Sequence, residues 1–330
     1  MERNPLKADP IAWLLACEEP VVRWWTRRDL LGTSGNDGDL ATARVEARNS
    51  AAAQAVLAGQ RSSGAWVSDR QLYSTKHLAT HWRLDLLADF GFTSDDEPVR
   101  KACGLFFAWQ LPSGDFAIDL GCARGYPCAT GRALCQFHRF GLGGDPRLAR
   151  AWGHLAGSQR ADGGWHCRGQ AMRPTGRSCF LATLKVLEAG AASGSTVDAS
   201  AAGPPQATDM DSLCYRAARF VHGCLMDPRI ERHNSPTLWD RFVYPNHWYD
   251  AAGVVDLLAG FGYGPDDPAM QSAVDLILRS QNADGTWNQA APLAWRGATP
   301  YPFGAVGEPS PWVTFRARRA LTRVWRSDGR

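Results

Sequence analysis

The sequence predicts an all-α protein built from about five or six helical hairpins, and three observations support this class. A phrase of Gln, three residues, Gly, one residue and an aromatic occurs four times, beginning at Gln60, Gln110, Gln159 and Gln281. Apolar stretches with helical spacing lie between the copies and end at glycine. Asp-Pro or Glu-Pro pairs then open further helices. Self-similarity of this kind indicates one supersecondary unit stacked on copies of itself.

Each part of the repeated phrase has a physical role in a turn between helices. Gly permits the left-handed backbone that ends a helix, and the Gln amide can bond main-chain groups freed at helix ends. The aromatic side chain buries a large area against the neighbouring repeat. The phrase therefore predicts architecture and by itself no chemistry.

The clearest repeat runs from Tyr126 to Trp165. Its first helix is expected over Tyr126–Phe140 and ends at Gly141, and Asp145-Pro146 opens a second helix that reaches Gln159. The same pattern predicts further first helices at His77–Phe90, Cys179–Ala189, Tyr249–Phe261 and Trp312–Trp325, another within Ile11–Leu31, and an outer helix at Leu213–Leu225.

The chain is expected to form a single domain, 1–330, because 45% apolar residues can bury a sizeable core if the repeats close on themselves. Residues 190–209 are rich in small side chains, which predicts a flexible insertion within this domain.

Composition excludes several classes of function. The net charge of +3 is small and the basic residues are dispersed, which argues against a nucleic-acid groove. The sequence has no signal-like start and no apolar run long enough to span a bilayer, so a soluble cytoplasmic protein is expected. Nine cysteines without the spacing of a disulfide framework predict reduced thiols.

These turns resemble those of squalene and oxidosqualene cyclases and of protein prenyltransferase β-subunits. The resemblance extends from Ile11 to Trp325. The segments Tyr126–Gly131 and Ser310–Arg316 are also similar to a group of uncharacterised bacterial proteins with the prenyltransferase/squalene-oxidase repeat. The resemblance implies an α/α toroid, with inner and outer rings of helices around an apolar cavity, and isoprenoid chains as the substrate class.

The family's functional residues match this sequence in part. Class II cyclases protonate their substrate from an Asp-x-Asp-Asp motif, and the nearest match, Asp209-Met210-Asp211-Ser212, lacks the last Asp and opens an expected outer helix. Prenyltransferases place a zinc-binding Cys and His at the starts of successive inner helices, where this chain has Cys179 and His247. The family's Asp ligand two residues before the Cys is Arg177 here.

Superposing the repeats at their aromatic–glycine helix ends gathers thiols and imidazoles at one end of the ring. Cys128, Cys179 and His247 open inner helices, and Cys167 lies on the third turn. Thiolate and imidazole suit tetrahedral zinc, and soft ligands also admit copper or iron. The alternative for each Cys is a small buried hydrophobic side chain. The hypothesis is a Cys₃His site, closed if structural and open if one ligand is missing.

Candidates for acid–base chemistry and for the cavity lining are expected at the same end. His81, Asp250 and Tyr249 are the predicted catalytic residues; the structural alternatives are a hydrogen-bonded core His81 and a first-turn acid at Asp250. The predicted lining residues are Lys76, His77, Trp82, Thr130, Trp248 and Trp312. The run Arg316–Arg319 is interpreted as a solvated helix face, with a diphosphate-binding patch that includes Lys76 as the alternative.

Three functions follow from these residues. The leading hypothesis is a terpenoid-cyclase-like enzyme that acts on a hydrophobic small molecule, with isoprenoid chains as the candidate class, in a central cavity with a Cys/His metal or thiol site at its mouth. The second is a non-catalytic binding or scaffold toroid with structural zinc or packing cysteines. The third is a prenyltransferase β-subunit-like transferase, which would need a partner subunit.

Overall fold

The computed structural model describes residues 6–33, 38–73, 76–167, 176–195, 209–230, 238–291 and 303–326. These residues are mainly helical, and their extended pairings are isolated bridges such as Gln110–Phe116. The predicted all-α class, built from helical hairpins, is confirmed for the described residues. The chain forms two compact units, unit 1 with Met1–Val56 and Leu225–Arg330, and unit 2 with Leu57–Cys224.

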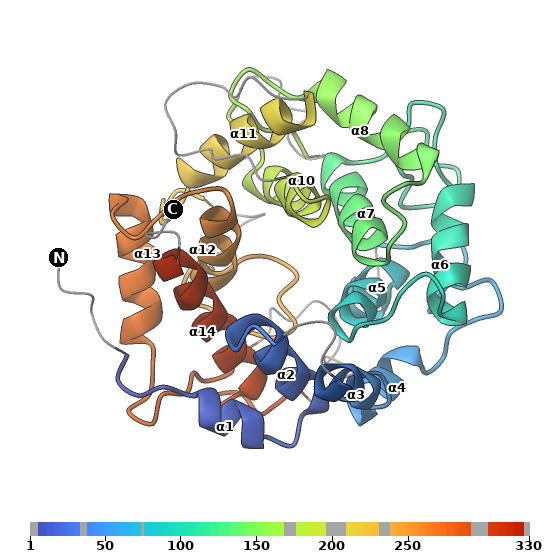
Figure 1. The fold of residues 1–330 in the computed structure, drawn as a ribbon. Coiled ribbons are helices and arrows are strands. Elements are labelled where there is room, and N and C mark those ends of the chain that lie inside the picture. The colour runs from blue at the N-terminus through green and yellow to red at the C-terminus, as the bar shows by residue number, and fades with distance from the viewer. Residues whose placement is uncertain are drawn as a thin grey trace. The chain divides into compact units, whose positions relative to one another are not determined.

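Unit 2 contains three hairpins, each with an inner helix followed by an outer one (Figure 1). The inner helices are α5 (Thr80–Asp89), α7 (Pro127–Arg139) and α10 (Phe180–Ala192), and the outer ones are α6 (Glu97–Ala108), α8 (Pro146–Ser158) and α11 (Asp209–His222). A short 3-10 helix, η2 (Lys76–Leu78), precedes α5. The inner helix α7 packs against both α5 and α10. It approaches α10 closely at Gly131, where an added Cβ would lie 2.8 Å from the main chain of Lys185.

Unit 1 combines the two ends of the chain (Figure 1). Its helices are α1 (Ile11–Ala16), α2 (Pro20–Trp25), the π-helix η1 (Thr26–Leu30), α3 (Gly38–Arg48), α4 (Ala51–Leu57, of which the last residue belongs to unit 2), α12 (Ala251–Gly260), α13 (Pro268–Arg279) and α14 (Pro311–Arg326). Helix α12 packs against α13 and α14, and α14 also contacts α1, α2 and η1. The C-terminal helix thus joins the N-terminal helices to the rest of this unit.

The stretch Ile11–Leu31, expected to hold one first helix, is divided into α1, α2 and η1. Pro20 is the first residue of α2, and Glu19 before it is extended with ψ 105°. A residue that precedes proline is disfavoured in the helical region, so a continuous helix through Glu19 is not formed.

Each repeated turn requires glycine for two reasons. Gly64, Gly114, Gly163 and Gly285 have φ between +87° and +97°. A Cβ on any of them would overlap main-chain atoms of the next outer segment; on Gly64 it would lie 2.5 Å from the Lys101 carbonyl carbon, and on Gly285 2.7 Å from the Ala8 oxygen. The predicted left-handed turn is confirmed, and glycine also permits the close approach between repeats.

The glutamine of each turn bonds main-chain groups, as the sequence predicts, and it also joins its own turn to the next outer segment. Gln110 Nε2 donates to the carbonyl oxygens of Gly114 (2.9 Å) and Arg147 (2.8 Å), the latter at the start of α8. Equivalent pairs of bonds run from Gln60 to Gly64 and Pro98, from Gln159 to Gly163 and Leu213, and from Gln281 to Gly285 and Ala8. In unit 1 the segment before α1 therefore takes the place of a following outer helix.

A threonine on each of four inner helices fixes the aromatic end of a turn, a pattern that sequence analysis missed. The aromatic residue's main-chain N–H donates to the threonine hydroxyl over 2.9–3.2 Å in the pairs Trp66–Thr80, Phe116–Thr130, Trp165–Thr183 and Trp287–Thr314. Thr130, predicted to line a cavity, is fully buried and belongs to this set. The separation along the chain varies from 14 to 27 residues, which conceals the pattern.

The predicted insertion at 190–209 is described only at its ends. Helix α10 continues to Ala192, so the first three of these residues are helical, and Asp209 is the first residue of α11. Residues 196–208 lie outside the described residues. None of the helices described is long and apolar enough to cross a membrane.

Candidate functional site

The three thiols of the predicted metal site lie in unit 2. Cys128 is the second residue of α7, and Cys179 is the N-cap of α10. The Cys179 N–H donates to the Trp165 carbonyl (2.7 Å), which places Cys179 beside the turn that carries Cys167.

The fourth predicted ligand, His247, lies in unit 1 and precedes α12 instead of opening it, because Asp250 is the cap and Ala251 the first helical residue. Over the described residues, no group of three or more His, Cys, Asp or Glu side chains could hold a metal ion. The donor set does not fit the expected site, so no chemical step is assigned to a metal.

Both carboxylate oxygens of Asp250, a predicted catalytic residue, accept hydrogen bonds within the protein. It is fully buried, accepts from the Gly253 N–H (2.7 Å) and from Asn246 Nδ2 (2.7 Å), and forms two bonds with Arg316 (2.8 and 3.1 Å). It thus caps α12 and ties it to α14. A catalytic role for Asp250 stays a prediction that these contacts disfavour.

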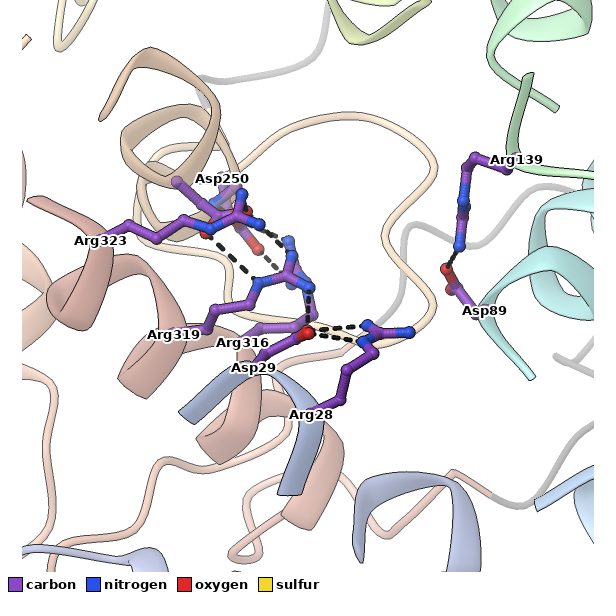
Figure 2. Close-up of polar contacts among 10 residues, drawn as sticks. Arg28, Asp29, Asp89, Arg139, Asp250, Arg316, Arg319 and Arg323 are labelled. Carbon is purple, nitrogen blue, oxygen red and sulfur yellow. Dashed lines mark hydrogen bonds and ion pairs between the residues drawn. The ribbon is translucent and has the colours of Figure 1, made fainter. Parts of the chain in front are cut away.

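Arg316 and Arg319, interpreted as part of a solvated face of α14, instead bond acids of neighbouring elements, which corrects that interpretation for these two residues. Arg319 bonds Asp256 on α12 (2.9 Å) and Asp29 on η1 (3.4 Å), and Arg323 also reaches Asp256 (3.2 Å). We name Arg28, Asp29, Asp250, Asp256, Arg316, Arg319 and Arg323 the unit-1 network; Figure 2 shows the side chains converging between the helices. Burial acts to raise the pKa of Asp29, but Arg28, Arg319 and Arg323 outweigh this effect and hold the pKa below its ordinary value.

The aromatic candidates of unit 1 pack against one another or bond the main chain. Tyr249, a predicted catalytic residue, is buried, and its hydroxyl donates to the Ile230 carbonyl (3.0 Å). Trp312 is buried in a stack with Tyr244, with ring centroids 4.6 Å apart. Trp248 is half-buried just before α12. These contacts account for Tyr249 and Trp312 as core residues.

The remaining candidates flank the start of α5 in unit 2. Lys76 and His77 lie in η2, and His77 is near Trp82, with ring centroids 6.2 Å apart; the side chain of Lys76 lies outside the described part. Trp82 is buried, and its indole Nε1 donates to the Tyr73 carbonyl (3.1 Å). Its ring supports the guanidinium of Arg132, which lies 4.0 Å from the ring centroid.

His81 is the predicted catalytic residue with the most distinctive surroundings. It is fully buried on α5, and neither ring nitrogen meets hydrogen-bond geometry with a partner in the described residues. Tyr73 and Phe106 contact its ring edge-on, with centroids 5.6 and 4.4 Å away. Burial lowers the pKa of His81 well below its ordinary value, Arg132 adds to this effect and Gln136 opposes it. The imidazole is therefore neutral at physiological pH.

A carboxylate lies one helical turn beyond His81. Asp85 pairs with Arg132 of α7 and accepts from Gln136 Nε2 (2.5 Å), and the same Nε2 donates to the His81 carbonyl (2.7 Å). We name His81, Asp85, Arg132 and Gln136 the unit-2 cluster. Gln136 thus fixes the carboxylate and the backbone of His81 in one arrangement.

The electrostatics of this cluster favour a carboxyl group that can hold a proton. Burial raises the pKa of Asp85 above its ordinary value, although Arg132, Gln136 and Lys185 each act to lower it. The Asp85 side chain retains 24% exposure, whereas Arg132 retains 4%. A proton or a substrate atom can therefore reach the carboxyl group, while the guanidinium stays covered.

Two further ion pairs border the cluster. Asp89, the next acid along α5, pairs with Arg139 (2.6 Å), and Lys185 pairs with Glu188 on α10 (2.8 Å). Burial raises the pKa of the nearby Cys135 thiol to about 12, so this thiol stays protonated.

The sequence analysis missed Asp85, Arg132 and Gln136. A signal was present: His81, Asp85 and Asp89 recur every four residues and so share one face of a predicted inner helix. Arg132 and Gln136 have the same spacing on the next inner helix. Polar residues at that spacing on helices expected to be buried are the feature to look for.

The chain matches several solved structures, but no protein-family model and no curated protein matches it. A variant of the type II terpene cyclase MstE from Scytonema, in complex with geranylgeranyl dihydroxybenzoate, is 16% identical, with 94% of this chain and 87% of that chain covered and a TM-score of 0.46. Another MstE variant, in complex with merosterolic acid A, covers 92% and 86% at 16% identity and a TM-score of 0.46. A protein from Actinoplanes covers 93% and 90%, also at 16% identity and a TM-score of 0.46.

Proposed function

We propose that the chain is an enzyme that transfers a proton to a hydrophobic, isoprenoid-type small molecule, with Asp85 as the acid. The observation that carries this proposal is the unit-2 cluster, in which a carboxyl group of raised pKa lies one turn from a buried neutral imidazole. Two titratable groups with displaced pKa values are the usual basis for assigning an acid and a base.

The reaction is a protonation of a carbon–carbon double bond. The π electrons form a new C–H bond with the proton of Asp85, whose O–H bond breaks and leaves a carboxylate facing Arg132 and Gln136. The substrate cation then loses a neighbouring proton, or adds water and loses a proton from it. Neutral His81 accepts this proton and gives it up when the product leaves, and Asp85 is reprotonated through its exposed side.

The substrate class rests on the repeated turns, which resemble those of the terpenoid cyclases, and on the surroundings of the cluster. Tyr73, Trp82 and Phe106 present aromatic rings beside His81 and Arg132, so an apolar chain is better matched here than a polar metabolite. Geranylgeranyl dihydroxybenzoate, the ligand bound to the Scytonema cyclase, is a suitable first substrate to test.

Deuterium incorporation tests the proposal. Incubation of the protein with a geranylgeranyl compound in D₂O should give a product with one deuterium bound to carbon, detected by mass spectrometry. The Asp85→Asn variant should reduce this incorporation by at least about 100-fold, the usual contribution of a positioned acid. Asp89→Asn, on the same helix face, is the matched control and should retain it. Tight binding without turnover would instead favour the non-catalytic binding module.

The Cys/His site and its zinc are a separate proposal. Cys167 and Cys179 lie on adjacent segments of unit 2, which supports at most a local thiol pair. Elemental analysis of protein purified without a metal-affinity tag tests the site: about one equivalent of zinc that is lost in Cys179→Ala supports it. Zinc-free protein with an unchanged fold would leave the cysteines as packing residues.

A further inference from the structure

In the unit-2 cluster, His81 and Gln136 carry three buried polar atoms whose hydrogen-bonding capacity is unused within the described residues. They are Nδ1 and Nε2 of His81 and Oε1 of Gln136. His81 is 0% exposed and Gln136 1% exposed. Gln136 is close enough to the imidazole to favour its protonation, yet the two side chains do not meet in a hydrogen bond of normal geometry. Buried polar groups without a hydrogen bond of normal geometry are often satisfied by a third group.

The orientation of the Gln136 amide is fixed, so its oxygen cannot turn away. Nε2 donates to two acceptors, the His81 carbonyl and the Asp85 carboxylate. A flipped amide would set Oε1 against both of these oxygens and lose both bonds. The His81 ring is likewise held by the edges of Tyr73 and Phe106.

The groups around these atoms select the chemistry of a ligand. Asp85 would repel an anion and Arg132, with Lys185 behind it, would repel a cation. A neutral imidazole offers one donor and one acceptor, and the amide oxygen offers an acceptor. An alcohol hydroxyl can accept from the imidazole N–H and donate to the amide oxygen, and a water molecule can donate to both the imidazole nitrogen and the amide oxygen, so either one can bridge the two side chains.

We infer that a hydroxyl group taking part in the reaction binds between His81 and Gln136, supplied either by the substrate or by a reacting water molecule. The inference rests on the proposed function, because it names the polar part of that substrate or the nucleophile that ends its reaction. In the second case the oxygen of water forms a bond to the substrate cation, and the proton it loses passes to His81.

Binding of two matched probes to the wild-type protein tests the inference. Geranylgeraniol should bind at least about tenfold more tightly than the hydrocarbon that lacks its hydroxyl, if the substrate supplies the group. If the two probes bind equally, the hydroxyl is that of water, and the product formed in H₂¹⁸O should carry the heavy oxygen. Equal binding together with a product free of ¹⁸O would overturn the inference.

Two substitutions test whether the preference for a hydroxyl group depends on His81 itself. His81→Phe should abolish the preference for the alcohol or the ¹⁸O incorporation, whichever the wild type shows. His138→Phe, which alters a histidine of α7 that bonds Trp152 (3.2 Å), is the control and should retain it. A preference that survives in His81→Phe would contradict the inference. If His81→Phe does not fold, binding of the two probes to the wild-type protein and its ¹⁸O incorporation still test the inference.

The outcome is distinguishable from failure of the proposed function. Loss of deuterium incorporation in the wild type would remove the assigned acid, yet a preference for the alcohol over the hydrocarbon would still establish the hydroxyl site. Conversely, deuterium incorporation with equal binding and no ¹⁸O would keep the acid and remove the hydroxyl site.

Discussion

In unit 1 the Asp250 carboxylate receives four hydrogen bonds, from the Gly253 N–H, Asn246 and both terminal nitrogens of Arg316. In unit 2 Asp85 also faces an arginine across neighbouring inner helices, but its surroundings include a fully buried His81 and a Gln136 oxygen with unused capacity. Under the proposed function, the same type of contact serves two purposes. A carboxylate whose bonds are all satisfied fixes helices, whereas one beside donors and acceptors that are unused within the described residues is suited to chemistry.

The balance of charge differs in the same way. In the unit-1 network, four guanidinium groups surround three carboxylates, and Arg319 links Asp256 to Asp29 (Figure 2). The pKa of Asp29 is lowered there, whereas burial raises that of Asp85 in unit 2. The arginines beside Asp29 therefore favour its ionised form, whereas burial favours the protonated form of Asp85.

The largest effect is expected from Asp250→Ala. This change leaves Arg316, with a side chain only 17% exposed, without its partner and removes the cap of α12. We expect a loss of about 3–5 kcal/mol in the free energy of unfolding, measured by urea denaturation. Asp85→Asn should cost clearly less, while it abolishes deuterium incorporation.

The double variant Asp250→Ala with Arg316→Met serves as the control for this prediction. It removes the uncompensated charge together with its partner and should recover part of the lost stability. If Asp250→Ala had the same free energy of unfolding as the wild type, the contrast between the two units would be wrong, because unit 1 would then not depend on the unit-1 network.

The repeated turns should respond alike in both units. Gly163→Ala in unit 2 and Gly285→Ala in unit 1 each place a Cβ at positive φ against the main chain of the next segment, and each should cost about 2–4 kcal/mol. Gly141→Ala, with φ +85° and open space around the position, should cost only about 1 kcal/mol in the same denaturation experiment. Unequal costs for Gly163 and Gly285 would show that the two units differ in scaffold as well as in their acid–arginine contacts.

Sequence alone predicted the hairpins and turns because each rests on local chemistry. The Gln110–Gly114 turn requires a φ that glycine permits, and Asp145-Pro146 begins α8 at the expected residue. The sites were predicted less well, since their contacts join residues about 50 or more apart, as in Arg132–Asp85 and Arg316–Asp250. Helical spacing predicts that Asp85 and His81 share one face of a helix. It does not predict which arginine pairs with which acid, because that pairing depends on how neighbouring helices pack.

The two units should also differ in the sign of their pH dependence. For Asp29, with a lowered pKa in the folded state, stability is present above the unfolded pKa and is lost as pH falls through the folded value. For Asp85, with a raised pKa, ionisation opposes folding as pH rises above the unfolded value. Asp29→Asn should therefore destabilise the protein more near neutral pH than at about pH 3, and Asp85→Asn should be relatively more favourable near neutral pH. Unfolding free energies of both variants at the two pH values decide this, and equal signs would contradict the difference between the units.

The smallest effects are expected where the two units resemble each other, at exposed ion pairs. Arg323 is 50% exposed and adds one bond to an Asp256 carboxylate that Arg319 already holds, and Arg139, 35% exposed, pairs with a partly exposed Asp89. Because water solvates a half-exposed guanidinium, Arg323→Ala and Arg139→Ala should each cost no more than about 1 kcal/mol, and the cost should shrink further in high salt. Urea denaturation at low and high ionic strength measures both. A cost above about 2 kcal/mol for Arg323→Ala that persists in high salt would mean that the fourth guanidinium of the unit-1 network is structurally required.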